Sequence, residues 1–213
     1  SISLMVLIFS KSAFVRTGLP EPLGLYNPRH EHDACGIGFV ADIKNRKSHD
    51  IIADGLKILD NLEHRGAVGA DPKAGDGVGI LIQTPDAFFR KVSSEAGFDL
   101  PEEGSYAVGF FFLPPETENR IQVEKIAENI VAEEGHTVLG WRDVPVDNGD
   151  LGYSIVPSEP VIRQIFVAND KKDRDQNGFE RDLFIIRRTV ELAFSAASID
   201  AARRFFYIPS FSS

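Results

Sequence analysis

The stretch that decides the fold is His-Asp-Ala-Cys-Gly-Ile-Gly-Phe, residues 32–39. After Cys35, small and apolar residues alternate, which is typical of a buried strand. Gly36 and Gly38 let the backbone approach another group closely, and we expect them to serve packing rather than substrate binding. Cys35 is the one cysteine of the chain, which excludes an intramolecular disulfide and any zinc site that needs two or more cysteines.

A lone cysteine is most often a small buried hydrophobic residue. The residues around Cys35 instead favour a catalytic or metal-binding role for it. His30 and His32 are polar residues that a core does not readily accommodate. A metal site made of these two histidines and Cys35 is an alternative, but the spacing matches no common pattern. A cysteine–histidine dyad with His64 or His136 is another alternative, on which spacing alone does not decide.

Strands and helices recur along the rest of the chain. Apolar residues recur at helical spacing between residues 48 and 63, and glycines and prolines mark several element ends. At least two strands are apolar on both faces, which predicts one sheet covered by helices on its two sides. We expect strands over residues 36–43, 77–83, 106–113, 137–144, 161–168 and 205–208, and helices over residues 48–63, 84–95, 116–134 and 179–197, with Pro85 in the first helical turn.

A glycine-rich loop precedes the second of these strands. Gly75, Gly77 and Gly79 are similar in spacing to a phosphate-binding loop. Such a loop follows a strand and opens a helix, whereas this one leads into an apolar strand. We therefore interpret it as a tight turn, and we assign Asp76 no catalytic role.

Length and composition exclude several function classes. The chain has 213 residues, of which 43% are hydrophobic and 26% charged, as in ordinary globular proteins. Its 23 basic and 32 acidic side chains give a net charge of −9, which argues against nucleic acid as the main partner. The apolar run 2–9 is too short to span a bilayer and lacks the preceding basic residue of a signal peptide, so we expect a buried strand or a leader there. Turn-forming residues recur up to residue 34, and we predict a leader over residues 1–34 and the main domain over residues 35–213.

Several segments together resemble the glutamine amidotransferase domain of the glutamate synthase large subunit. They include the stretch around Cys35, Glu-His-Arg-Gly-Ala at residues 63–67 and the glycine-rich segment 73–81. The resemblance also includes the segments 140–145, 163–167 and 206–210, so that it covers nearly all of residues 32–213. The segment around Trp141 separates this family from other class II glutamine amidotransferases, which share the cysteine and the arginine–glycine pair.

The resemblance implies an α+β fold, the four-layer αββα sandwich of N-terminal-nucleophile hydrolases, with two sheets where the pattern predicts one. It also implies a cut after Ala34 that makes Cys35 the first residue of the mature chain. A free α-amine has a pKa of about 7.7–8.0 and a thiol one of about 8.5, so the amine can take the thiol proton near neutral pH. The thiolate would then attack the side-chain amide of L-glutamine. By the same resemblance Arg65 supports the active-site cysteine; the alternative is a helix-end cation that contacts the last carbonyls.

In complete members of this family the ammonia is channelled to 2-oxoglutarate, which is reductively aminated in domains that hold FMN and an iron–sulfur cluster. The given sequence stops before the later segments that complete the family's active site, and one cysteine cannot hold such a cluster. We therefore expect no cofactor in this chain and little glutaminase activity from it alone. The implied partners are the rest of the glutamate synthase chain and a reductase subunit or ferredoxin, with no nucleic acid and no membrane. The implied location is the cytoplasm, or a plastid in a photosynthetic eukaryote.

Two other functions stay open at this point. Another class II amidotransferase would pass ammonia to a different acceptor, although the segments around Trp141 and Phe166 disfavour it. An inactive truncated module would fold or bind a partner without catalysis. The sequence beyond residue 213 would distinguish among these alternatives.

Overall fold

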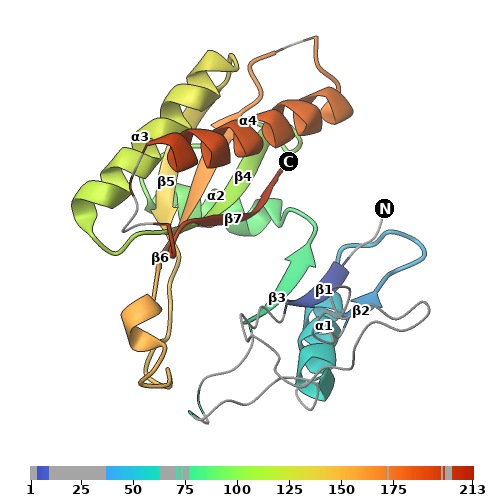
Figure 1. Ribbon diagram of the computed structural model, residues 1–213. Helices are drawn as coiled ribbons and strands as arrows, with labels where there is room; N and C mark the ends of the chain where they lie inside the picture. Colours follow the sequence, from blue (N-terminus) through green and yellow to red (C-terminus); the bar gives the residue numbers. More distant parts are fainter. Residues whose placement is uncertain are drawn as a thin grey trace, which may run out of the picture. The chain divides into compact units, whose positions relative to one another are not determined.

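The computed structural model describes residues 4–9, 37–62, 71, 73, 77–171, 173–197, 199 and 203–213. The chain divides into two compact units (Figure 1). Unit 1 comprises Ser1–Gln83 and Leu151–Ser154, and unit 2 comprises Thr84–Asp150 and Ile155–Ser213. None of the helices in the described ranges is long and apolar enough to cross a membrane.

Unit 1 contains a three-stranded antiparallel sheet in the order β2-β1-β3. The strands are β1 (Leu4–Phe9), β2 (Ile37–Val40) and β3 (Gly77–Ile82), and helix α1 (His49–Leu62) contacts all three. Strand β1 pairs with both of the others. The strand interpretation of the run 2–9 is therefore confirmed for Leu4–Phe9, whereas the assignment of residues 1–34 to a leader stays a prediction.

Unit 2 contains a four-stranded antiparallel sheet in the order β5-β6-β4-β7. Its strands are β4 (Tyr106–Leu113), β5 (Thr137–Asp143), β6 (Val161–Ala168) and β7 (Tyr207–Ser212). Its helices are α2 (Asp86–Glu95), α3 (Thr117–Glu133) and α4 (Gln176–Ala196), with a short 3₁₀ helix at Val156–Ser158.

The two faces of this second sheet are covered by different helices. Residues of β4 alternate between two hydrophobic clusters, because successive side chains of a strand point to opposite faces. Ala107 and Phe111 belong to the cluster formed with α3 and α4, whereas Tyr106 and Val108 pack in the cluster that contains Phe89 of α2. Figure 1 shows α3 and α4 on the same side of the sheet. The α+β class is thus confirmed, and the described residues form two sheets rather than the single sheet that the pattern predicts.

Three predicted element ends differ from the structure for local reasons. Helix α2 begins at Asp86 instead of at residues 84–85, so that Pro85 is the N-cap residue before the helix and not its first helical position. Helix α4 begins at Gln176, three residues earlier than predicted, because the Asp175 side chain accepts a hydrogen bond from the Gly178 backbone N–H at 2.7 Å. Strand β7 extends to Ser212 because its residues pair with β4 that far.

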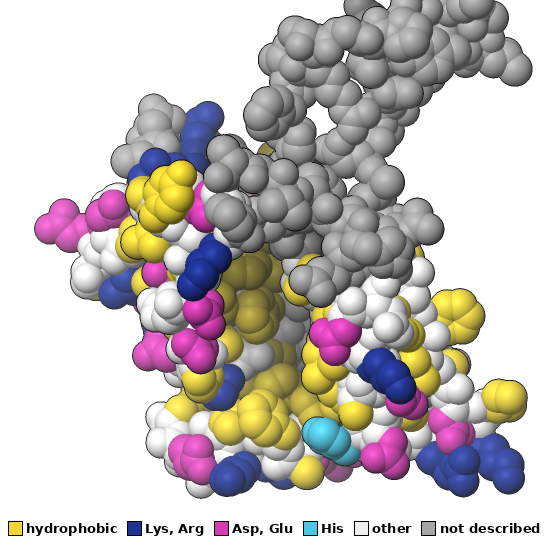
Figure 2. Space-filling model, turned by 90° about the horizontal axis from the view of Figure 1, so that it is seen from below, with side chains coloured by type: hydrophobic (Ala, Val, Ile, Leu, Met, Phe, Trp, Pro, Cys, Tyr) yellow, Lys and Arg dark blue, Asp and Glu magenta, His cyan; other side chains and the backbone are white. Residues whose placement is uncertain are grey.

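Several large hydrophobic side chains stay exposed, and hydrophobic groups reach the surface on the face seen in Figure 2. In unit 1, Ile37 and Phe39 of β2 are 63% and 71% exposed, and Leu81 of β3 is 45% exposed. In unit 2, exposed hydrophobic residues include three on α4, which are considered below.

Candidate active site

The two predicted site residues, Cys35 and Arg65, lie outside the described residues, as do His30, His32 and His64. The elements next to them in sequence are all in unit 1. Strand β2 begins two residues after Cys35, and helix α1 ends three residues before Arg65. Strand β2 and helix α1 are therefore the described elements nearest in sequence to the two predicted site residues.

Helix α1 packs very closely on strand β2. The helix begins where the Ser48 hydroxyl accepts a hydrogen bond from the Asp50 backbone N–H at 3.1 Å. A Cβ atom on Gly38 would lie 2.4 Å from Cγ2 of Ile58, so glycine is required there for the helix to approach the strand. This contact agrees with the packing role predicted for Gly38, whereas Gly36 lies outside the described residues.

Asp71 forms hydrogen bonds with Ser154, which lies 83 positions later in the chain. Its carboxylate accepts hydrogen bonds from the backbone N–H of Ser154 at 3.0 Å and from the Ser154 hydroxyl at 2.8 Å. The backbone N–H of Lys73 donates a third one at 3.1 Å. A Cβ atom on Gly152 would lie 2.4 Å from the same carboxylate, so this connection also needs glycine at that position.

These contacts keep Asp71 ionised. The hydrogen bonds from the backbone and side chain of Ser154 lower the pKa of Asp71 below its usual value of 3.8, although burial of the carboxylate, which is only 6% exposed, opposes them. Asp71 lies six residues after Arg65 in the sequence. Sequence does not single out Asp71, because its partner Ser154 is 83 positions away. The one local signal is the proline after it, which is typical of a turn.

His136, a candidate partner for the cysteine, belongs to a buried cluster in unit 2. Its side chain is fully buried, and Nε2 lies 3.3 Å from Oδ2 of Asp182. The backbone N–H of Asp170 donates to Nδ1 at 3.4 Å, so Nδ1 is the acceptor and Nε2 carries the proton. Because both ring nitrogens already have partners inside unit 2, His136 does not offer a free base for a dyad.

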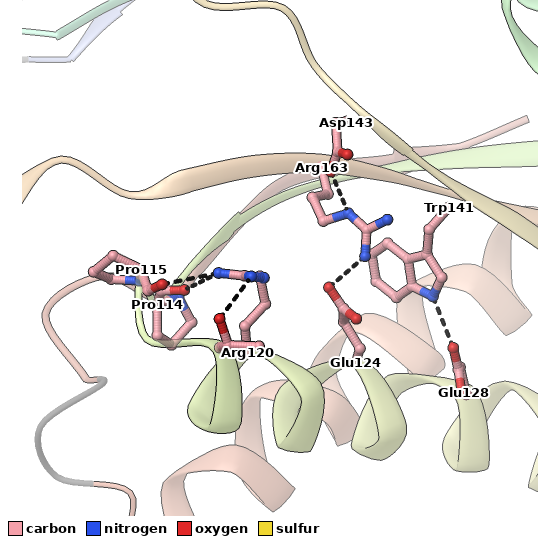
Figure 3. Close-up of polar contacts among 9 residues, drawn as sticks. Pro114, Pro115, Arg120, Glu124, Glu128, Trp141, Asp143 and Arg163 are labelled. Carbon is pink, nitrogen blue, oxygen red and sulfur yellow. Dashed lines mark hydrogen bonds and ion pairs between the residues drawn. The ribbon is translucent and has the colours of Figure 1, made fainter. Parts of the chain in front are cut away.

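The two segments that distinguish the resembled family meet in unit 2 (Figure 3). The Arg163 side chain of β6 contacts Glu124 of α3 at 2.6 Å and Asp143 of β5 at 2.7 Å. Its guanidinium lies over the Trp141 ring, 5.4 Å from the ring centre, and the indole N–H of Trp141 donates to Glu128 at 2.9 Å. These contacts hold the outer strand β5 and helix α3 together, so the segments around Trp141 and Arg163 act in the scaffold of the domain.

The described residues provide no evident metal site. No group of three or more histidine, cysteine, aspartate or glutamate side chains in the described ranges is arranged to hold a metal ion. The alternative that uses His30, His32 and Cys35 falls on residues outside these ranges.

Comparison with protein families gives one match that covers most of the chain. Residues 35–213 match the family described as class-II glutamine amidotransferases. The matched region begins at Cys35, the residue that the sequence analysis places at the start of the main domain.

Individual relatives are glutamate synthases. The chain is 43% identical over 195 residues to the NADPH glutamate synthase large chain of Bacillus subtilis, which covers 92% of this chain and 12% of that protein. It is 41% identical over 183 residues to the NADH glutamate synthase of Saccharomyces cerevisiae, covering 82% and 8% of the two chains. For ferredoxin-dependent glutamate synthase 1 of Arabidopsis thaliana, named chloroplastic/mitochondrial, the identity is 38% over 182 residues, covering 84% and 11%.

The chain thus spans about a tenth of the length of these relatives. The family match and the relatives confirm the resemblance that the sequence segments indicate. They test neither the role of Cys35 nor that of Arg65, which stay predictions.

Proposed function

This chain belongs to the class-II glutamine amidotransferase family, in its glutamate synthase branch, and we propose that Cys35 is the nucleophile of its glutaminase site. The observation that carries the proposal is the family match that starts at Cys35. The chain contains no other cysteine that could take this role.

The proposed chemistry begins with hydrolysis of the Ala34–Cys35 peptide bond, which frees the α-amine of Cys35. This amine takes the thiol proton, and the thiolate attacks the side-chain amide carbon of L-glutamine. The ammonium group returns the proton to the leaving nitrogen, so that ammonia departs and a glutamyl thioester remains. Water then hydrolyses the thioester, which yields glutamate and restores the thiol.

Arg65 is proposed to support the region of the active-site cysteine. It follows α1 by three residues, and α1 is fixed to β2 by the close contact between Ile58 and Gly38. Asp71, six residues after Arg65 in the sequence, is hydrogen-bonded to Ser154.

For the whole parent protein we propose glutamate synthesis from the ammonia released at this site. The ammonia would be channelled to 2-oxoglutarate and incorporated by reductive amination, with FMN and an iron–sulfur cluster in the other parts of the parent. The relatives are named for NADPH, NADH or ferredoxin, and we expect a reductase subunit or ferredoxin as the electron-supplying partner here. We expect the parent in the cytoplasm, or in a plastid if the source is photosynthetic.

The test uses the full-length parent and its Cys35→Ala variant. Glutaminase activity should fall by at least about 10³-fold, because removal of a nucleophile leaves only the remaining catalytic groups. Glutamate formation from added ammonia should persist in the variant, which controls for folding and for the other domains. Full glutamine-dependent activity in the variant would contradict the proposal.

The maturation step needs a separate measurement. A glutamine-like electrophile, reacted with the wild-type parent, should form its adduct on Cys35, and mass spectrometry of the labelled peptide should show Cys35 at its N-terminus. An active enzyme in which Cys35 is unlabelled or still joined to Ala34 would exclude this mechanism. Ammonia transfer to an acceptor other than 2-oxoglutarate would instead identify another class II amidotransferase.

A further inference from the structure

Helices α3 and α4 cover the same face of the second sheet but have different outer surfaces. The exposed positions of α3 are mainly polar or charged, and its one large exposed hydrophobic residue is Ile121, 42% exposed. On α4, Phe184 is 64% exposed, Ile185 44% and Leu192 63%. The inner face of α4 is nevertheless complete, with residues such as Leu183 and Ile186 fully buried.

The exposed hydrophobic residues of α4 form one surface. Ile185 and Leu192 are seven residues apart, which is two helical turns, and Phe184 lies beside Ile185. Arg181 and Arg188 are exposed on the same side of the helix, one turn before and one turn after Phe184 and Ile185. We call these five residues the α4 outer patch. Clustered exposed hydrophobic side chains with charged groups at the border are typical of interaction surfaces, whereas single ones such as Ile121 are ordinary.

We propose that the α4 outer patch is covered in the parent protein by another part of the same polypeptide. This inference rests on the proposed function, in which the chain is one domain of a glutamate synthase. About nine tenths of the length of the relatives lies outside the region matched by this chain, so a large covering surface is available in cis. Arg188 already forms an ion pair with Glu191 on the same helix, so the covering surface should be apolar with an acidic residue opposite Arg181.

A second copy of this chain fits the patch less well. Each copy has a net charge of −9, and like charges of this size oppose association. Tethering to the same polypeptide avoids the entropy cost of bringing two separate molecules together. The charge and the length of the relatives therefore both favour an intramolecular partner.

Hydroxyl-radical footprinting of the full-length parent tests the proposal through the oxidation of single side chains. Leu192 is compared with Ile121, its matched control on α3. In this chain Leu192 is 63% exposed. If the parent buries it like a core side chain, to about 5% exposed, its oxidation should be about tenfold slower than the rate expected for 63% exposure. Ile121 should oxidise at the rate expected for a side chain that stays exposed. Equal protection factors for Leu192 and Ile121, or rapid oxidation of Phe184, would overturn the proposal.

Two further arms identify the occupant. Dilution of the parent should leave the protection of Leu192 unchanged, and loss of protection on dilution would show a second copy instead and overturn the proposal. The variant Phe184→Asp should restore rapid oxidation of Leu192, whereas Ile121→Asp should not. Continued protection of Leu192 in Phe184→Asp would mean that the patch is not the contact surface.

Glutaminase activity of the wild-type parent is measured in the same samples. Its absence would contradict the proposed function and leave the footprint to be judged on its own. An active parent with an unprotected patch would contradict only the inference about α4.

Discussion

Unit 2 buries a full hydrophobic core, whereas the described residues of unit 1 include large hydrophobic side chains of its sheet that are exposed. Within the described residues, all hydrophobic side chains that count as buried belong to unit 2, from Phe89 to Phe211. In unit 1, Ile37 and Phe39 are 63% and 71% exposed although they lie in the strand that follows Cys35. The difference agrees with the helices that the structure describes, since each face of the second sheet packs on helices, whereas α1 is the one described helix that contacts the first sheet.

The alternation along β2 explains which face is left open. Gly38 points toward Ile58 of α1, so Ile37 and Phe39 point to the opposite face of the sheet. Few buried apolar contacts mean a low free energy of local opening. From the described residues we therefore predict a lower local stability for unit 1 than for unit 2.

The largest expected effect is on the core of unit 2. Phe111 is fully buried and its ring contacts Trp141, with ring centres 5.3 Å apart. Phe111→Ala should lower the free energy of unfolding by about 3–5 kcal/mol, because it leaves a cavity in the packed core. Denaturant unfolding can be followed through the fluorescence of Trp141, the one tryptophan in the chain.

The control for this change is in unit 1. Phe39→Ala removes the same side chain from an exposed position and should cost less than about 1 kcal/mol. Similar losses in the two variants would show that Phe39 is buried in solution and that the contrast between the units is wrong.

The next effect concerns the buried charge cluster of unit 2. Asp182 accepts a hydrogen bond from Lys171 at 2.9 Å, faces the Nε2–H of His136, and lies 3.5 Å from Arg174. Burial raises the pKa of Asp182, but the hydrogen bonds from Lys171 and His136 and the nearby charges outweigh it, so that the pKa falls below 3.8. A carboxylate with a lowered pKa stabilises the folded state above about pH 3.8, and this stabilisation is lost as the pH falls through the lower folded value.

Asp182→Asn should therefore destabilise the chain by about 1.5–3 kcal/mol at neutral pH, the usual loss for hydrogen bonds to a charged group. The difference from the wild type should shrink as the pH falls below 3.8. Free energies of unfolding measured between neutral and acid pH would show this convergence. Asp173→Asn, at an exposed position in the loop before α4, is the control and should leave the pH profile unchanged. A difference that stays constant with pH would contradict the role of the Asp182 charge.

The sequence predicts elements best where local signals are strong. Strands β4 and β6 have the predicted bounds because each is rich in apolar and β-branched or aromatic residues and is bounded by polar or turn-forming residues. The start of α4 was missed because Gln176 and its neighbours are polar, and only the Asp175 cap places them in the helix. The presence of two sheets came from the resemblance, since hydrophobic periodicity does not report which strands pair.

In the candidate site, too, the residues with local sequence signals were predicted and those that depend on distant contacts were not. Cys35 and Arg65 came from the residues and the family resemblance, and they stay predictions because they lie outside the described residues. Asp71 and the environment of His136 could not be predicted, because their partners lie 83 and 46 positions away. Such contacts depend on tertiary packing, and a local signal such as the proline after Asp71 predicts a turn but not the partner.

A smaller effect is expected at the contact between α1 and β2 in unit 1. Gly38→Ala places a Cβ atom 2.4 Å from Cγ2 of Ile58 and should destabilise unit 1 by about 1–3 kcal/mol, the usual cost of overpacking. Hydrogen exchange should accelerate at amides of β2 and α1 and stay unchanged in β4. The double variant with Ile58→Ala removes the clashing atom and should recover part of the loss.

Gly149→Ala is the matched control in unit 2, because its Cβ atom would meet only an ordinary contact of 3.5 Å with Asp147. Faster exchange across both units in Gly38→Ala would show that they do not open independently. No acceleration at all would mean that α1 is not held against Gly38 as described.

The smallest expected change links the comparison to catalysis. Asp71→Asn keeps the size of the side chain but replaces one carboxylate oxygen with an amide nitrogen that cannot accept the hydrogen bonds from Ser154. If Asp71 positions the connection that carries Arg65, glutaminase kcat of the full-length parent should fall about tenfold, since small displacements of catalytic groups have effects of this order or more. The unfolding of unit 2, measured through Trp141 in the chain of residues 1–213, should not change.

A double-mutant cycle with Ser154→Ala separates this positioning role from general destabilisation. Both substitutions remove the same contact, so their effects on kcat should overlap instead of adding. Additive effects, or a loss of unit 2 stability as large as the loss of kcat, would place Asp71 among purely structural residues. A normal kcat in Asp71→Asn would mean that the contact with Ser154 fixes the chain without affecting Arg65, and that the low local stability of unit 1 does not limit its chemistry.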